Sequence, residues 1–236
     1  VFINDLFPKD WQSFFLGRDQ EYLKAPSDAL FVSLFPPFAN IDIAYTPRFD
    51  ADRFLSGERL SYWNGRRLAG RDAVANPDRP DAWFEDDEVA VRLYRYVGGL
   101  ELALYGYDGF WKSPGGMDAA SGRPVFPPLS VVGASARGPL GEAIVHFEAG
   151  YYDSRDDRDG DDPLVNNSET RLLAGYEREV ARDVTIALQY YLECLQHHDA
   201  YLDGWAALGA DTATARDSAR HTVTLRMTWL LWDQKL

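Results

Sequence analysis

Several features that would identify other protein classes are missing from this 236-residue chain. Its single cysteine, Cys194, excludes an internal disulfide framework, and with it a small secreted domain held by disulfides. No stretch approaches the ~20 consecutive apolar residues that a membrane-spanning helix needs. This second absence does not exclude membrane strands, because the strands of a barrel alternate apolar and polar residues.

Positive charge is also scarce. The chain has 24 Lys and Arg against 37 Asp and Glu, which gives a net charge of −13. A polyanion repels phosphate backbones, so we expect no nucleic-acid partner. The chain opens with Val1 and lacks the basic stretch and apolar core of a secretory signal peptide. We therefore expect a mature or internal sequence, and the missing signal says nothing about export.

Aromatic and turn-forming residues are abundant: 13 Tyr, 13 Phe, 7 Trp, 19 Gly and 13 Pro. This composition favours many strands joined by turns. A short turn of helix is expected only within residues 202–216. Alternation of apolar and polar residues predicts nine strands, at residues 28–35, 40–47, 87–97, 100–110, 128–137, 142–152, 169–179, 184–195 and 219–231.

The predicted connections alternate between short and long. Four are hairpin-sized, namely Pro36-Pro37-Phe38-Ala39, Gly98-Gly99, Gly138-Pro139-Leu140-Gly141 and Val180-Ala181-Arg182-Asp183. The connections between these hairpins are long and polar, at residues 48–86, 111–127, 153–168 and 196–218. Short turns on one side and long loops on the other are typical of a meandering membrane barrel.

The strands have two distinct faces. In residues 184–195, for example, Val184, Ile186 and Leu188 oppose Thr185 and Gln189. Most predicted strands reach the ~9–11 residues of a tilted membrane strand, and aromatic residues cluster at their ends as in interfacial girdles. We therefore predict an all-β, antiparallel meander that forms a partial transmembrane β-barrel, with Phe147, Leu188 and Leu225 on an outer apolar belt. A soluble antiparallel barrel or sandwich, with its apolar face inward, remains an alternative.

Four stretches carry a resemblance to a known family. They are residues 101–114 (ELALYGYDGFWKSP), 133–139 (GASARGP), 148–154 (EAGYYDS) and 175–179 (GYERE). They resemble a poorly characterised family of proteobacterial outer-membrane proteins with porin-like β-barrels. The resemblance implies a location in the outer membrane of a Gram-negative bacterium, in contact with lipid and lipopolysaccharide. It implies no substrate and brings no catalytic signature.

Charged and amide side chains recur on the polar strand faces. We interpret them as the lining of a channel for small solutes or ions, or as a ladder of ion pairs that holds the wall together, and the two readings are compatible. A non-channel barrel with a structural or binding role is the alternative function. The pore-lining candidates are Glu88, Arg92, Glu101, Glu148, Arg171, Glu177, Gln189, Glu193 and Arg226.

Other constellations give weaker signals. The acidic loop at 153–163 offers Asp156, Asp157, Asp159 and Asp161 as calcium ligands, but its spacing fails the EF-hand pattern, which favours a solvated loop. The neighbouring His197 and His198 are not expected to share a metal, because adjacent residues of an extended chain point oppositely. His146 lies near Glu148, yet no nucleophile or metal motif accompanies it. We therefore expect neither catalysis nor a cofactor.

The strand count predicts an open sheet. Nine strands in a simple meander leave the first and last strands parallel, whereas single-chain bacterial barrels have an even number. We expect residues 1–236 to be one barrel segment, and an incomplete one, in which strand 142–152 pairs with both of its sequence neighbours. Residues 1–27 are expected to be a loop region lying over one mouth or edge. The number of subunits cannot be predicted.

Overall fold

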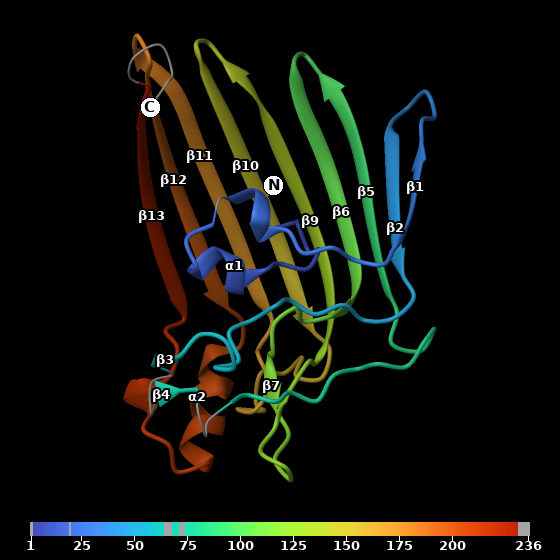
Figure 1. Ribbon diagram of the computed structural model, residues 1–236, viewed down its shortest axis with the longest axis vertical. Coiled ribbons are helices and arrows are strands. Elements are labelled where there is room, and N and C mark those ends of the chain that lie inside the picture. The colour runs from blue at the N-terminus through green and yellow to red at the C-terminus, as the bar shows by residue number, and fades with distance from the viewer. Residues whose placement is uncertain (1, 19, 64–67, 71–73, 231–236) are drawn as a thin grey trace.

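A nine-stranded antiparallel sheet dominates the computed structural model, which describes residues 2–18, 20–63, 68–70 and 74–230 (Figure 1). All nine predicted strands are present in the sheet, in sequence order. They are β1 (Leu30–Leu34), β2 (Asn40–Thr46), β5 (Glu88–Val97), β6 (Leu100–Phe110), β9 (Pro128–Leu140), β10 (Ala143–Ser154), β11 (Glu169–Ala181), β12 (Val184–Leu195) and β13 (Ala219–Trp229).

Each strand pairs with its neighbours along the chain. The predicted pairing of β10 with both β9 and β11 is confirmed, with Gly150 opposite Gly133 on one side and Arg171 on the other. β1 and β13 lie at opposite ends of the strand order and are not bonded to each other in the described residues. The sheet is therefore open, as the odd strand count predicts.

Two strands are longer than predicted, because the residues read as turns continue the ladder. Pro139 pairs with Ile144, and Leu140 with Ala143, so only two residues connect β9 to β10. Ala181 likewise pairs with Val184, which leaves Arg182 and Asp183 as the next turn. The predicted end of the last strand, at residue 231, lies outside the described residues.

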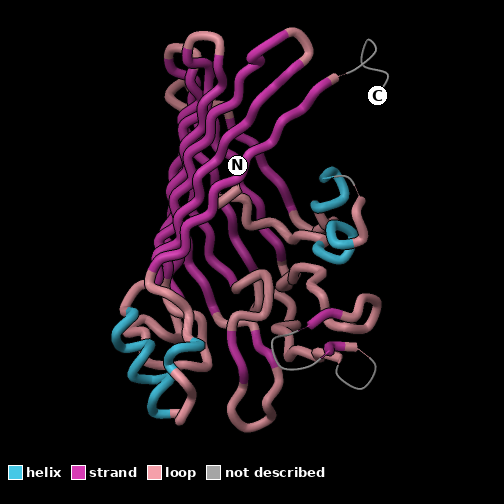
Figure 2. Tube along the Cα trace, turned by 90° about the vertical axis from the view of Figure 1, so that its left-hand side faces the viewer, coloured by secondary structure: helices cyan, strands magenta, loops and turns pink. Residues whose placement is uncertain are grey.

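The turns and loops are sorted by length, as predicted. The short connections lie at one end of the sheet and the long ones at the other (Figures 1 and 2). The predicted helical turn is present, but the helix begins at His198, before the predicted range of residues 202–216. The loops contain β3 (Tyr62–Trp63), β4 (Leu68–Ala69), β7 (Gly116–Met117), β8 (Pro124–Val125), α2 (His198–Ala207) and the 3₁₀ helix η2 (Thr212–Thr214).

The N-terminal region differs from the prediction. It contains a short helix, α1 (Trp11–Phe15), and a 3₁₀ helix, η1 (Gln20–Leu23), so it is not a plain loop. Its first residues cross one face of the sheet instead of a mouth or an edge (Figures 1 and 2). Ile3 packs there against the sheet and is 2% exposed. The prediction failed because alternation describes strands only and contains no information about where an irregular segment packs.

The opposite face of the sheet is bare and apolar. Phe147, Leu188 and Leu225 lie on it, as predicted, and are 48%, 47% and 70% exposed. The same face continues across the sheet through Leu104, Val132, Val223, Met227 and Trp229, all of them exposed. Among the described residues, no helix has the length and apolarity to span a bilayer.

Candidate functional site

The nine predicted pore-lining residues all lie on the covered, polar face of the sheet. Successive side chains of a strand alternate between faces, so Gln189 and Glu193 share one face of β12 while Leu188 faces away. The register carries this face to the neighbouring strands, with Arg171 opposite Glu193 and Thr224 opposite Gln189. The alternation was sufficient to assign all nine residues to one surface.

Near the long loops, the polar face carries a buried ion pair. Lys112 Nζ lies 2.6 and 2.7 Å from the two carboxylate oxygens of Glu88. Tyr107 Oη also donates to Glu88, at 2.5 Å. Burial lowers the pKa of Lys112 because it disfavours the ammonium form, and the adjacent Glu88 carboxylate opposes that shift. Glu88 is 3% exposed, so this is one of the most sheltered charged groups on the face.

A second cluster joins β11, β12 and the loop that follows. Glu193 accepts hydrogen bonds from Arg216 and Arg220, each at 2.8 Å. Glu169 binds Arg216 at 2.7 Å and Arg171 at 2.7 Å. Both carboxylates are buried, and together they hold the α2 loop at this end of the sheet.

The charges become more exposed toward the short turns. Arg92 Nη2 lies 2.6 Å from Glu101, whose other oxygen accepts from Tyr96. Arg226 reaches Glu177 at 3.2 Å, with both side chains more than 40% exposed. These positions give a hydrated surface with charges of both signs, and solutes could contact it.

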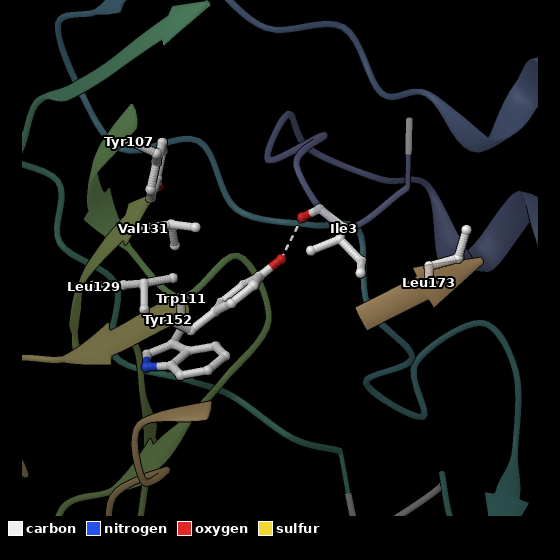
Figure 3. Packing of buried hydrophobic residues seen from close by; sticks show 7 residues of the cluster. All are labelled: Ile3, Tyr107, Trp111, Leu129, Val131, Tyr152 and Leu173. Atoms are coloured by element: carbon white, nitrogen blue, oxygen red, sulfur yellow. Dashed lines mark hydrogen bonds between the residues drawn. The ribbon is translucent and has the colours of Figure 1, made fainter. Parts of the chain in front are cut away.

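Near the middle of the polar face, Glu148 is hydrogen-bonded by the backbone of the N-terminal segment. The N–H groups of Phe2 and Ile3 donate to its carboxylate at 2.8 Å. The Tyr152 hydroxyl donates to the carbonyl of Ile3, and the Tyr152 ring stacks on Trp111 at 5.8 Å between centroids (Figure 3). The nearby His146 has its Nε2 3.2 Å from the side-chain nitrogen of Gln189.

The sequence reasoning missed several residues of this face. Glu169 lies two positions before Arg171 on the same strand, so alternation could have identified it. Lys112 and Arg216 lie in loops, where no periodicity indicates which way a side chain points. Their roles follow only from the contacts that the fold creates.

The four calcium-ligand candidates do not come together. Asp156, Asp159 and Asp161 are exposed, whereas Asp157 is buried. Among the described residues, no three His, Cys, Asp or Glu side chains form a group that could hold a metal ion. His198 instead contacts the carbonyl of Arg216 at 2.9 Å. The exposure of Asp156, Asp159 and Asp161 agrees with the solvated loop that the spacing favoured.

Asp157 has an unusual environment. Its Oδ1 accepts from the N–H of Asp162 at 3.1 Å, while its buried Oδ2 has no hydrogen-bond partner. Burial raises the pKa of Asp157 above its usual range, because the charged carboxylate is poorly compensated. Asp157 lies in the loop between β10 and β11 and is not one of the residues on the polar face.

No protein family, curated protein or solved structure matches this chain.

Proposed function

We propose that this chain forms part of the wall of a bacterial outer-membrane β-barrel, a porin-like channel for the passive passage of small solutes or ions. One observation carries the proposal: the bare face of the sheet exposes large apolar side chains, whereas the sheltered face carries paired charges around a small buried apolar cluster. A soluble barrel buries its apolar face and exposes the polar one. A lipid surrounding would favour the arrangement seen here, which supports the proposal.

Strand length and end chemistry support the same proposal. β6, β10 and β12 have 11, 12 and 12 residues, enough for a tilted strand to cross the apolar layer. The charged residues of the apolar face lie near its ends: Asp108 and Asp153 near the long loops, and Arg95 and Arg178 close to the short turns. Arg178 pairs there with Glu142. The side chains of Arg95 and Arg178 could reach lipid or lipopolysaccharide headgroups.

Closure requires additional strands. In a nine-strand meander the two edge strands, β1 and β13, run parallel, so they cannot close an antiparallel barrel with each other. Unpaired edge groups cost several kcal/mol each in lipid. We propose that an odd number of strands from outside residues 1–236 completes the wall.

A non-channel barrel with a structural or binding role is the second candidate. The ladder of ion pairs and the segment lying across the polar face favour it, since both fill space that a channel would leave open.

The test uses the intact polypeptide that contains this chain. It should fractionate with the outer membrane, migrate differently in detergent gels before and after heating, and give discrete conductance steps in a planar bilayer. Glu177→Lys should shift the reversal potential under a salt gradient toward anion selectivity. Glu142→Lys makes the same charge change at a turn and should shift it less.

The alternatives give different results. Membrane localisation with silent bilayers would support the structural or binding barrel. Recovery as a soluble monomer without detergent would refute any membrane role and would restore the soluble all-β alternative.

A further inference from the structure

Residues 2–7, here called the strap, lie across the polar face of the sheet. The strap is irregular, and Figure 1 shows it in front of the central strands, close to β9 and β10. It is tied to these strands by side-chain and backbone contacts. Phe2 and Ile3 donate to Glu148 of β10, and Asn4 Nδ2 lies 3.3 Å from the carbonyls of Ala134 and Ala149.

Two facing glycines make room for the strap. Gly133 of β9 and Gly150 of β10 are register partners. A Cβ on Gly133 would lie 1.7 Å from Asn4 Oδ1, and one on Gly150 would lie 2.7 Å from Ile3 Cγ2. Neither glycine has a positive φ, so the requirement for glycine comes from space and not from backbone conformation. At Gly150 the closest obstacle is the strap, whereas at Gly133 a Cβ would also lie 2.8 Å from the carbonyl oxygen of Ala149 in β10. The pair forms a notch that Ile3 and Asn4 fill.

The strap is anchored through residues 2–4 and is less buried beyond them. Ile3 and Asn4 are 2% and 8% exposed, whereas Phe7 is 43% exposed. Phe2 is 57% exposed, and its ring contacts Tyr191 edge-on. Asn4 Oδ1 is buried in the notch without a hydrogen-bond partner, which disfavours the docked state.

Cavities of about 260 and 330 Å³ flank the strap. Leu6 and Phe7 line both of them; Asn4 also lines the first, and Ile3 the second. The cavities leave Leu6 and Phe7 partly unpacked, although Leu6 still contacts the apolar cluster around Ile3. A segment anchored mainly at one seat can leave that seat without unfolding the sheet.

We propose that the strap is a displaceable gate, which narrows the lumen when it is seated in the glycine notch and widens it on leaving. This inference rests on the proposed channel function and adds a means of regulating it. The strap crosses the same face that carries the candidate lining residues. A seated strap therefore narrows the path that a solute would take along that face.

One test displaces the strap by filling its seat. In the intact polypeptide, Gly150→Val should push Ile3 out of the notch and raise single-channel conductance several-fold. Gly106→Val is the matched control, because a Cβ there meets no atom within 4 Å. It should leave the conductance unchanged.

A second test locks the strap in its seat by a disulfide. It does not require β10 to fold with a valine at position 150. Asn4 Cγ lies 2.7 Å from the Cβ position of Gly133, so cysteines at these two positions are within disulfide reach. In a Cys194→Ser background, the oxidised pair should give low conductance and reduction should raise it several-fold. The single Gly133→Cys variant should not respond to the reductant.

Thiol labelling gives a readout that needs no current. Ser135 is 9% exposed and lines a cavity together with Phe2. Ser135→Cys in the Cys194→Ser background should be labelled by a maleimide several-fold faster when Gly150→Val is added.

The outcomes separate the gate from the channel. Equal conductance steps and equal labelling rates with the strap locked or released would overturn the gate alone. Silent bilayers for the parent and every variant would overturn the proposed channel, and the gate with it.

Discussion

The two faces of the sheet are built from the same strands but have opposite chemistry. On the bare face, large apolar side chains such as Leu225 and Val132 are exposed. On the covered face, the carboxylates of Glu193 and Glu169 are buried and are bound by three and two arginines, respectively. The comparison teaches that burial alone does not separate the two faces by polarity. The covered face buries carboxylates next to an apolar cluster that includes Leu129 and Val131, whereas the bare face leaves large apolar side chains exposed.

Breaking the most sheltered ion pair should produce the largest effect. Glu88→Gln leaves the Lys112 ammonium buried without its carboxylate and should destabilise the folded protein by about 3–5 kcal/mol. Urea unfolding in detergent measures the change. Adding Lys112→Met should restore most of the stability, since a buried pair replaced by apolar groups is often neutral. A single-variant loss within about 0.5 kcal/mol would show that the pair is solvated.

Neighbouring residues on β13 compare the two faces directly. Leu225 points to the apolar face and Thr224 to the polar face, and both are exposed. In a bilayer, Leu225→Arg should cost about 2–4 kcal/mol, because a guanidinium near the midplane meets hydrocarbon. Thr224→Arg should cost far less.

Folding into lipid vesicles, followed by urea titration, gives both values. If the two arginine variants were equally stable in vesicles, the apolar face would not be facing lipid.

The smallest expected effect lies outside the sheet. The folded-state pKa of Asp157 is raised, so its contribution to stability is fully present below the unfolded pKa and is lost as pH rises through the folded pKa. The loop should therefore be less protease-resistant at pH 7 than in mild acid. Asp157→Asn should remove this difference and stabilise the loop at pH 7 by about 1 kcal/mol.

Limited proteolysis across pH measures the effect on the loop. Asp156→Asn, the exposed neighbour, is the control and should keep the parent's pH dependence. A matching loss of pH dependence in both variants would show that the loop's total charge is responsible instead.

The sequence by itself determined the strands, their order and their two faces. Leu188 and Gln189 could be assigned to opposite faces because the side-chain period of a strand is two, whatever surrounds it. Sequential pairing followed from the short turns, and Gly98-Gly99, with φ of 58° and 86°, forms such a turn between Val97 and Leu100. The candidate lining residues could be predicted for the same reason.

Only the tertiary structure decided what irregular segments do. Pro139 was predicted to be a turn residue but lies inside β9. The ladder continues to Leu140 and leaves only two residues for the turn before β10. Lys112 and Arg216 reach the polar face from loops, and Ile3 and Asn4 occupy a notch made by glycines far away in sequence. The contacts of Ile3 and Asn4 join residues more than a hundred positions apart, and those of Lys112 and Arg216 join a loop to a strand. No local periodicity records either kind, because both depend on how the completed sheet brings separate backbone segments together.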